Sequence, residues 1–521
     1  MNRSTRLALL SDTQPWDVLI IGGGASGLGA AVDAAARGYR TLLVEARDFA
    51  SGTSSCSTKL IHGGVRYLRQ GDFSLVRNAL QERAHLLKNA AHLVHPLAFV
   101  IPTGNLFDRL FYGAGLKLYD LLAGKQGLAS SQILNRQEVI NALPGLSEAE
   151  LNGNQLNGGI RYWDGQFDDA RLAISLMRTA TDLGASCFNY LAVSQLTKAN
   201  ERIVGAILSD TETGNTYEVK ARSIINATGV YADQIRQLDD PKASALLTPS
   251  QGIHIVVDAE FLPGQQALLI PETEDGRVMF AIPWQGKVII GTTDTPRPEL
   301  KQLDDPQPLA EEINFLLRTA ARCLCKAPTR NDIRSIFAGL RPLIHPDHSD
   351  GQNTAALSRE HTVLTSKSGL ITVTGGKWTT YRLMAEHVIN RAAEVASLPN
   401  VACSTRQLKL HGNTDQPVNN VYGSDAPLLA ALPGYEIKLH LNLPYSEAMV
   451  RYAIRYEAAR SIEDILARRT RALFLDAAAA TTCIERVAQI FQEELKIPTE
   501  NLNEMIRKAH ITSRRFSQLP F

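Results

Sequence analysis

The amino-acid sequence predicts an α/β protein with a helical C-terminal part. Three observations lead to this prediction. An apolar segment near the N-terminus runs into a glycine-rich turn and a helical pattern, region 252–343 holds short apolar runs typical of antiparallel strands, and helical segments separated by prolines follow residue 399. We expect a Rossmann-like nucleotide-binding domain and an antiparallel β domain within residues 1–398, and a helical domain over residues 399–521.

The glycine-rich turn has the spacing of a dinucleotide-binding motif. A predicted buried strand, 17–21, is followed by Gly22, Gly24 and Gly27, and Glu45 closes the next predicted strand. Gly22 permits a tight turn, Gly24 lets the backbone approach a pyrophosphate, and Gly27 lets helix and strand pack closely. Glu45 lies at the distance of an acid that binds a ribose 2′-hydroxyl, and it disfavours a 2′-phosphate. A chance turn is the alternative, but strand, helix and acid together favour FAD or NAD.

Composition excludes several classes of protein. Lys plus Arg number 54 and Asp plus Glu 53, so the net charge is +1 and no overall field attracts nucleic acid. The 6 cysteines form no C-x-x-C pair, which favours reduced thiols over a metal or iron–sulfur site. The first residues lack the long apolar core of a signal peptide, and no run of about 18 apolar residues predicts a membrane span.

Two later segments favour a flavin over a nicotinamide cofactor. A predicted strand at 221–229 ends in Ala-Thr-Gly, and in flavoproteins such a late strand returns to the sheet beside the first one. Another strand, 369–374, leads through Gly375 and Gly376 into a helix that begins at Lys377. That helix N-terminus could face the N1–C2 edge of the isoalloxazine, where negative charge develops on reduction, unless it is an ordinary cap. FAD-binding segments are expected at about 15–75, 180–240 and 350–398.

Hydrophobic periodicity predicts the remaining elements. Before residue 399 we expect helices at 75–94, 106–122 and 171–183, and strands at 185–196, 203–208, 253–257, 278–282 and 288–291. After it we expect helices at 428–432, 446–456, 461–467 and 477–495. The helix 106–122 combines large apolar residues with charged ones, so it either packs on its own domain or lies at a membrane surface.

Motifs along nearly the whole chain carry a resemblance to a known family. They are the glycine turn with Glu45, T-S-S-C-S-T-K-L-I-H-G-G-V-R-Y-L at 53–68, D-G-Q-F-D-D-A-R at 164–171, N-A-T-G at 226–229, G-I-H-I-V-V at 252–257, G-T-T-D-T at 291–295, G-L-R-P-L at 339–343 and G-G-K-W-T-T-Y-R at 375–382. In this order they resemble the FAD-dependent glycerol-3-phosphate dehydrogenases of the respiratory, aerobic type, a branch of the D-amino-acid-oxidase-like flavoprotein superfamily.

The resemblance implies oxidation of sn-glycerol 3-phosphate to dihydroxyacetone phosphate by hydride transfer to FAD, with electrons passed to a membrane quinone. It implies a cytoplasmic enzyme held peripherally on the inner face of the cytoplasmic membrane, and it is compatible with a homodimer. The sequence lacks the cysteine-rich C-terminal extension of anaerobic relatives and the long insertion of oxygen-using glycerol-phosphate oxidases. A related amino-acid or glycerol-phosphate oxidase, or a non-catalytic FAD-binding module, stays open as an alternative.

Recognition of the substrate phosphate requires fixed cations. Arg341 ends a predicted strand directly before a proline, and its guanidinium can bind phosphate through two parallel hydrogen bonds. Arg66 and Tyr67 follow the small-residue loop and could close over the same anion. Lys377 begins a helix, where a cation opposes the helix dipole unless an anion lies beside it. We expect these four residues to bind substrate, and Arg341 and Lys377 also to act in catalysis.

Removal of the hydroxyl proton requires a base. His254 lies in an otherwise apolar predicted strand and is the favoured candidate, although a lone histidine there is more often a core residue. His62 is a weaker candidate and is expected to hold its loop against the flavin. Other cofactor contacts are expected from small and polar residues, namely Thr53, Ser54, Ser55, Val193, Gly229, Gly375, Gly376 and Thr379.

Overall fold

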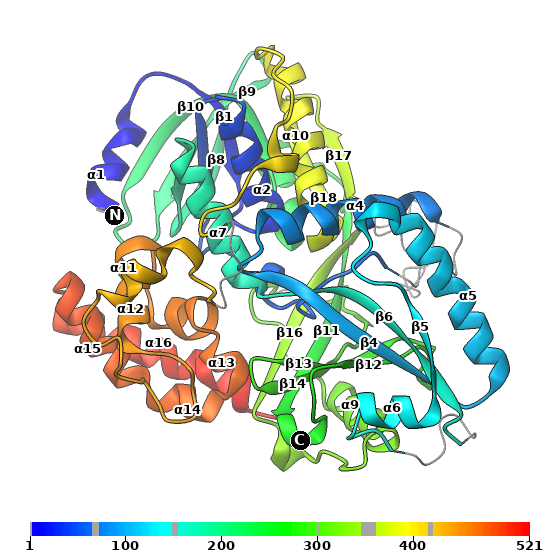
Figure 1. Cartoon of the computed structure of the whole chain (residues 1–521). Coiled ribbons are helices and arrows are strands. Elements are labelled where there is room, and N and C mark those ends of the chain that lie inside the picture. The colour runs from blue at the N-terminus through cyan, green and yellow to red at the C-terminus, as the bar shows by residue number, and fades with distance from the viewer. Residues whose placement is uncertain are drawn as a thin grey trace.

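The computed structural model describes residues 3–64, 72–147, 155–274, 276–300, 302–344, 361–414 and 420–520. Within these residues the chain forms two large sheets with helices packed around them (Figure 1). A group of helices at the C-terminus lies against the second sheet and against a helix of the first half, Asp169–Asp182. The first sheet lies in the upper part of the view, and the second lies at the lower right. This arrangement confirms the α/β class with a helical C-terminal part.

The first sheet has a parallel centre built on the predicted apolar strands. Its strand order is β17–β18–β10–β1–β2–β7, and β8 and β9 form a hairpin that continues β10. The strand that ends in Ala-Thr-Gly pairs in parallel with β1, as predicted. The bounds are β1 (Trp16–Ile21), β2 (Thr41–Val44), β7 (Ser186–Phe188), β8 (Leu191–Ala199), β9 (Arg202–Asp210), β10 (Thr216–Asn226), β17 (His361–Thr365) and β18 (Leu370–Gly375).

The helices of this half pack together on the sheet. The helix α2 (Ala25–Ala36) lies between α7 (Asp169–Asp182) and α10 (Tyr381–Ala396). Their apolar side chains form one core with the inward side chains of the parallel strands. The shorter α1 (Arg3–Leu7) and α8 (Ala232–Asp239) belong to the same half, on which the cofactor motif lies.

The glycine turn between β1 and α2 requires glycine at two positions. Gly22 has φ +113°, and a Cβ there would lie 2.6 Å from the carbonyl oxygen of Ala227. A Cβ on Gly27 would lie 1.9 Å from the carbonyl oxygen of Gly22. The first position therefore provides the turn and the third provides close helix–strand packing, as the motif predicts.

The second sheet is largely antiparallel, as predicted for region 252–343. Its order is β15–β11–β14–β13–β12–β4–β6–β3, with β16 paired to β11 and β5 to β6. The strands are β3 (Leu60–Ile61), β4 (Val94–Thr103), β5 (Gln132–Asn135), β6 (Gly158–Phe167), β11 (Leu247–Asp258), β12 (Ala267–Ile270), β13 (Met279–Trp284), β14 (Lys287–Gly291), β15 (Thr295–Pro296) and β16 (Ser335–Ile344). Its helices are α4 (Phe73–Asn89), α5 (Leu106–Ala123), α6 (Arg136–Ala142) and α9 (Ala310–Cys323).

Two predictions for the first 398 residues were wrong in part. The helix expected at 75–94 ends at Asn89, and β4 begins at Val94 because Pro96 disfavours helix there and the segment pairs with β6 along its whole length. The strand expected at 185–196 is divided into β7 and β8 by Tyr190, which has φ 56°. Asn189 in this turn donates hydrogen bonds to Asp48 and to the carbonyl of Ala458, contacts that a local pattern cannot reveal.

The C-terminal helices differ from the prediction in number and division. They are α11 (Ala426–Ala430), α12 (Glu447–Tyr456), a π-helical segment Asp464–Arg469, α13 (Ala472–Leu475), α14 (Ala477–Thr482), α15 (Ile484–Leu495) and α16 (Thr499–Ser517). The helix expected at 477–495 is divided at Cys483, and α16 was not predicted. The apolar period continues across the break, so it does not reveal the division.

The C-terminal helices share a hydrophobic core with the second sheet. Trp284 and Phe337 of that sheet lie in one cluster with Phe474 and Phe491. The domain boundary at residue 399 therefore stays a prediction. In the part of the chain that the structure describes, no helix combines the length and the apolar character needed to cross a bilayer.

Candidate active site

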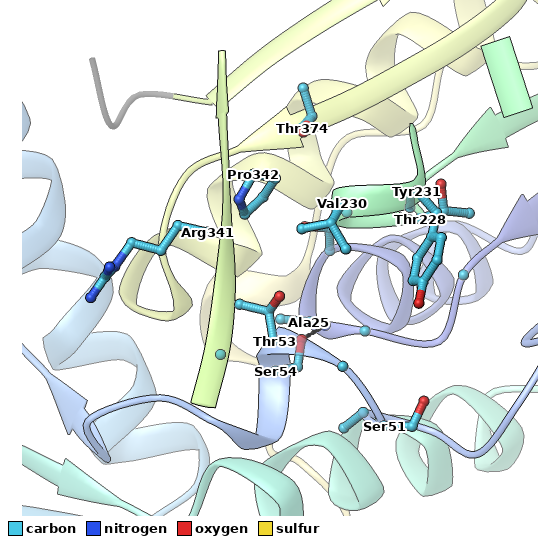
Figure 2. A pocket seen from close by; sticks show the side chains of 18 of the residues that line it. Ala25, Ser51, Thr53, Ser54, Thr228, Val230, Tyr231, Arg341, Pro342 and Thr374 are labelled. Carbon is cyan, nitrogen blue, oxygen red and sulfur yellow. Dashed lines mark hydrogen bonds between the residues drawn. The ribbon is translucent and has the colours of Figure 1, made fainter. Parts of the chain in front are cut away.

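A cavity of about 860 Å³ is lined by residues of both sheets (Figure 2). It runs from the glycine turn to the strands β11 and β16. Most of the predicted site residues line it, namely Gly22, Gly24, Glu45, Thr53, Ser54, His62, Val193, Gly229, His254, Arg341, Gly375, Gly376, Lys377 and Thr379. Arg66 and Tyr67 lie outside the described residues, so their predicted contacts stay predictions.

Glu45 stabilises the glycine turn at one end of the cavity. Its Oε2 accepts a hydrogen bond from the backbone N–H of Gly23 at 2.7 Å, and its Oε1 accepts one from the N–H of Arg47 at 2.9 Å. Burial raises the pKa of this carboxyl, and the two backbone hydrogen bonds oppose that shift. Glu45 therefore holds the turn in shape and lines the cavity at the same time.

The loop after Glu45 brings small polar residues to the cavity wall. The hydroxyl oxygen of Ser54 accepts from the N–H of Ala25, the first residue of α2, at 2.9 Å. Thr53 donates to the carbonyl of Leu340 at 2.5 Å, which ties the loop to β16. Trp378 donates its ring N–H to the carbonyl of Ser54 at 2.9 Å. The loop is thus fixed to both sheets.

Ser55 and Gly27 were predicted to contact the cofactor but lie outside the cavity lining. Ser55 is buried, and its carbonyl points toward cations on the other side of the loop. Ser55 ends a short 3₁₀ segment, Thr53–Ser55, and Gly27 lies in the first turn of α2. The cofactor contacts expected of Ser55 and Gly27 stay predictions.

His62 and Thr379 connect the two halves above the cavity. The N–H of His62 donates to Oγ1 of Thr379 at 3.2 Å, and the same hydroxyl donates to the carbonyl of His62 at 3.2 Å. Thr379 lies in the 3₁₀ turn Trp378–Thr380 that leads into α10. The position of His62 agrees with its expected role of holding the loop, which stays a prediction.

Arg341 lies on β16, and residues 292–294, which follow β14, hold its guanidinium. Its Nη1 pairs with Oδ1 of Asp294 at 3.1 Å, and its Nη2 donates to Oγ1 of Thr292 at 3.1 Å and to the carbonyl of Thr293 at 3.0 Å. Gly252 on the neighbouring strand makes room, because a Cβ there would lie 2.4 Å from Nη2. These contacts fix the direction of the guanidinium in the cavity wall before any ligand binds.

His254 lies on β11 and is almost fully buried, with 2% of its surface exposed. Its Nε2 lies 3.0 Å from Oγ1 of Thr58, and its ring stacks on Phe337 with 4.8 Å between centroids. Burial, followed by the charges of Lys59 and Arg341, lowers its pKa well below the usual 6.5. The imidazole is therefore neutral at neutral pH.

Lys377 follows two glycines with left-handed backbone, Gly375 at φ 75° and Gly376 at φ 77°. It directly precedes the 3₁₀ turn that leads into α10 and lines the same cavity as His254 and Arg341. A cation is thus placed where backbone N–H groups of a helix start also point. The two sources of positive potential favour an anion at this edge.

The sequence did not single out Thr58, Asp294 or Lys59. Thr58 and Lys59 stand in the motif at 53–68, and Asp294 stands in G-T-T-D-T, so their motifs were noticed without their roles. Each becomes significant only through a partner far away in the chain: His254 for Thr58, Asp169 for Lys59 and Arg341 for Asp294.

Comparison with known proteins identifies the family. A family model described as FAD dependent oxidoreductase matches residues 17–382, and one described as C-terminal domain of alpha-glycerophosphate oxidase matches residues 370–501. The chain is 39% identical over 538 residues to a mitochondrial glycerol-3-phosphate dehydrogenase of Mesocricetus auratus, covering 95% of this chain and 72% of that protein. The corresponding Homo sapiens protein is 38% identical over 558 residues, covering 99% and 75%.

The chain belongs to the FAD-dependent glycerol-3-phosphate dehydrogenase family. A solved structure of the glycerol-3-phosphate dehydrogenase from Bacillus halodurans, complexed with FAD, is similar with a TM-score of 0.80 and 29% identity, covering 100% of this chain and 98% of that one. The L-α-glycerophosphate oxidase of Mycoplasma pneumoniae shares the fold with a TM-score of 0.57 and 17% identity over 75% of this chain and 97% of that one.

FAD is the cofactor of this family, and the cavity has features that fit it. The N-terminus of α2 and the Gly24 backbone offer N–H groups to a pyrophosphate, and Glu45 lies beside them. The cavity then continues past the loop 53–58 toward Arg341. Its volume of about 860 Å³ is within the range of cofactor sites in proteins.

Proposed function

We propose that this protein oxidises sn-glycerol 3-phosphate to dihydroxyacetone phosphate and passes the electrons through FAD to a membrane quinone. One observation carries the proposal: His254, Arg341 and Lys377 line the same cavity as the glycine turn. A base and two cations thus stand at the end of a cofactor site. An alcohol that carries a phosphate suits this combination.

Arg341 and Lys377 bind the substrate phosphate. Asp294 and Thr292 hold the Arg341 guanidinium in a fixed direction. Its side chain therefore loses little conformational entropy when an oxyanion binds. Arg66 and Tyr67 are proposed to complete this site from the segment outside the described residues. A neutral substrate such as glycerol gains nothing from these cations, which is the basis of the expected specificity.

His254 accepts the proton of the substrate hydroxyl on its imidazole ring, whose Nε2 lies 3.0 Å from Oγ1 of Thr58. Its lowered pKa keeps it neutral, and a bound phosphate dianion beside Arg341 offsets one of the positive charges that lower it. Substrate binding therefore makes His254 a stronger base. Bound FAD would supply the oxidant, as the acceptor of a hydride from the carbon that bears this hydroxyl.

The segments predicted from the sequence would hold the cofactor. Gly22, Gly24 and Glu45 would hold the pyrophosphate and ribose region, and Gly375 with Gly376 would face the ring. The further cofactor contacts are Thr53, Ser54, His62, Val193, Gly229 and Thr379, all of which line the cavity.

Attachment to the inner face of the cytoplasmic membrane is proposed through α5. The inward face of this helix packs on the second sheet through Leu116 and Tyr119. Its outward face exposes a row of large apolar side chains, namely Leu106, Phe107, Leu110, Phe111, Leu118 and Leu121. Figure 1 shows α5 at the outer edge of the molecule. The inward face thus packs on its own domain, and the exposed apolar face supports the proposal because it suits the headgroup boundary.

Anaerobic titration tests the proposed reaction. Purified protein with bound flavin is mixed with glycerol 3-phosphate, and the loss of visible flavin absorbance is followed. We expect full bleaching by glycerol 3-phosphate and none by glycerol or by D- and L-amino acids at the same concentration. Reoxidation by a quinone analogue faster than by oxygen is expected of a dehydrogenase, and the opposite order would assign the chain to the oxidases.

A further inference from the structure

The loop 53–58 forms one wall of the cavity and touches the predicted base. The hydroxyl of Thr58 lies 3.0 Å from Nε2 of His254, and Thr53 at the other end of the loop is tied to the carbonyl of Leu340. Both Thr53 and Thr58 line the cavity. The position of this loop therefore decides whether Thr58 orients the imidazole.

A buried charged cluster of Lys59, Asp169 and Arg471 holds this loop, and its members lie outside the cavity lining. Nζ of Lys59 donates to the carbonyl of Ser55 at 2.7 Å and to Oδ2 of Asp169 at 2.7 Å. The same carboxylate oxygen accepts from Oγ of Ser57 at 2.7 Å. The cluster thus fixes Ser57, which directly precedes Thr58, and Ser55.

Arg471 completes the cluster from the C-terminal part of the chain. Its Nη2 donates to the Ser55 carbonyl at 2.7 Å and lies 3.2 Å from Oδ1 of Asp169, and its guanidinium lies 3.7 Å from the centroid of the Phe474 ring. Its backbone has φ 63°, a left-handed conformation that is unfavourable for a non-glycine residue. Such strain persists where surrounding contacts fix a residue, and it is common at functional sites.

Charge balance in the cluster depends on Arg471. Burial lowers the pKa of Lys59 to about 8, and burial alone would raise the pKa of Asp169, but Lys59 and Arg471 outweigh it and lower that pKa. Removing one partner of a buried ion pair leaves an uncompensated charge, and the neighbouring groups must move to solvate it. Ser55 and Ser57 of the loop contact the cluster directly, so the loop is among these neighbouring groups.

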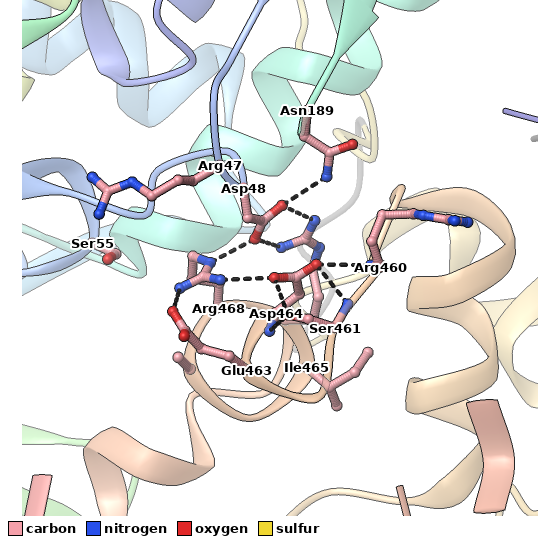
Figure 3. A network of polar contacts seen from close by, with 12 residues as sticks. Arg47, Asp48, Ser55, Asn189, Arg460, Ser461, Glu463, Asp464, Ile465 and Arg468 are labelled. Carbon is pink, nitrogen blue, oxygen red and sulfur yellow. Dashed lines mark hydrogen bonds and ion pairs between the residues drawn. The ribbon is translucent and has the colours of Figure 1, made fainter. Parts of the chain in front are cut away.

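A pair of arginines binds the segment that precedes this loop. Arg468 and Arg469 both donate to the buried carboxylate of Asp48, at distances of 2.5–2.8 Å (Figure 3). Burial would raise the pKa of Asp48, but Arg469 and Arg468 hold it at about 2. Asp48 lies three residues after Glu45, so the C-terminal part contacts the cofactor segment at two places.

We propose that Arg471 is a positioning residue for the oxidation: through the Ser55 carbonyl and Asp169 it holds the loop 53–58 so that the Thr58 hydroxyl stays against Nε2 of His254. The inference rests on the proposed function, since it concerns the base of that reaction. Thr58 then orients the imidazole toward the substrate hydroxyl. The C-terminal part of the chain is therefore needed for the chemical step.

A double-mutant cycle tests this role. The variants are Thr58→Val, Thr58→Ser, Arg471→Lys and the double variant Thr58→Val/Arg471→Lys. The measurement is the rate of anaerobic flavin reduction at saturating glycerol 3-phosphate over a range of pH. Thr58→Val should slow reduction about tenfold, the effect of one hydrogen bond, and shift its pH profile, whereas Thr58→Ser should retain the wild-type profile. Arg471→Lys should be slowed several-fold, and the double variant should equal Thr58→Val alone.

Arg451→Lys is the matched control, because Arg451 is a mostly buried C-terminal arginine that pairs with Glu493 and Glu494 and lies outside the loop and the cavity. We expect its rate to equal that of the wild type. Asp169→Glu keeps the charge of the cluster and provides a second cycle with Thr58→Val if Arg471→Lys fails to fold.

Three results would overturn the inference. They are a wild-type rate in Arg471→Lys, a double variant slowed by the product of the two single effects, and loss of flavin from folded Arg471→Lys, which would indicate a structural role alone. A wild-type protein that glycerol 3-phosphate does not bleach would instead contradict the proposed function. The two failures are thus distinguishable.

Discussion

One end of the cavity is lined mainly by backbone groups, and the other end is lined by long side chains. The cofactor end offers main-chain groups and small side chains from Gly22, Gly24 and the start of α2. The substrate end offers long polar side chains, Arg341 and His254, each held by other side chains. Local backbone geometry therefore decides the first end, and contacts between distant residues decide the second. Substitutions should affect the two ends in different ways.

The largest effect is expected from Gly24→Val at the cofactor end. Gly24 has φ −85°, so its backbone tolerates a side chain, but a Cβ there would lie 3.0 Å from Oγ of Ser54 and in the space assigned to the pyrophosphate. We expect a folded protein without FAD, measured as flavin absorbance per mole of protein. The control is Gly115→Ala, because a Cβ at Gly115 meets no heavy atom within 4 Å. A full complement of flavin in Gly24→Val would contradict the assignment of this end.

The next effect is expected from His254→Asn, which should leave FAD bound and slow flavin reduction on the order of 10²–10⁴-fold. Because the pKa of His254 is lowered, wild-type kcat/KM should rise with pH through an inflection below about pH 6.5 and then stay level. For kcat, the inflection should lie higher, since bound phosphate offsets the charge of Arg341.

The pH profiles of flavin reduction and of kcat/KM measure the difference between the two inflections. Both inflections should disappear in His254→Asn. An unchanged profile in that variant would assign proton removal to another group and would leave Arg341 and Lys377 with an electrostatic role.

Arg341→Lys should impair substrate binding without loss of flavin. Loss of a bidentate, charge-assisted contact costs about 2–5 kcal/mol, and a lysine keeps the charge but not the planar fork. The measurement is KM for glycerol 3-phosphate together with the rate of reduction. Arg334→Lys is the matched control, because Arg334 makes a similar paired contact with Asp258 just before the same strand. Equal turnover of glycerol and glycerol 3-phosphate by the wild type would remove the reason for a phosphate site.

A weaker, reversible effect is expected on the outer surface of the substrate half. Wild-type protein should float with anionic liposomes, and Leu110→Glu plus Phe111→Glu should abolish flotation while flavin reduction stays unchanged. Both side chains are more than half exposed, at 57% and 52%, so the change does not disturb the core. A wild type that stays in the soluble fraction would contradict membrane attachment, and unaltered flotation of the double variant would exclude α5 only.

The smallest effect is expected at His411, which joins the cofactor half to the C-terminal helices. Its Nδ1 lies 2.6 Å from Asp182 of α7 and its Nε2 lies 2.8 Å from Asp425. Burial would lower its pKa, but the hydrogen bonds of Asp425 and Asp182 outweigh it and raise the pKa. A raised pKa means that the stabilisation is complete below about pH 6.5 and is lost as pH rises through the folded-state pKa. The difference in Tm between wild type and His411→Gln should therefore be larger at about pH 6 than at about pH 9, and a difference independent of pH would exclude the charged pair.

The same contrast explains what the sequence could predict. The parallel strands, the glycine turn and the antiparallel region followed from local patterns, because apolar period and glycine spacing reflect local backbone geometry. His254 and Arg341 were found as residue types that stand out in their strands. Thr58 and Arg471 were not, because a threonine in a polar loop and an arginine among other arginines become significant only when the fold brings a distant partner to them. The turn at Tyr190 could not be predicted for the same reason, because Asn189 in this turn binds residues that are distant in the sequence.

The ion pair between Asp48 and Arg468 joins residues 420 positions apart. At about 5–20 residues per second, a ribosome needs roughly 20–80 s to travel that distance, and Arg468 must also clear the exit tunnel. During this time the nascent nucleotide-binding half exists without the arginines that later neutralise its buried acid. The buried carboxylate of Asp48 therefore gains its arginine partners only after most of the chain has been synthesised.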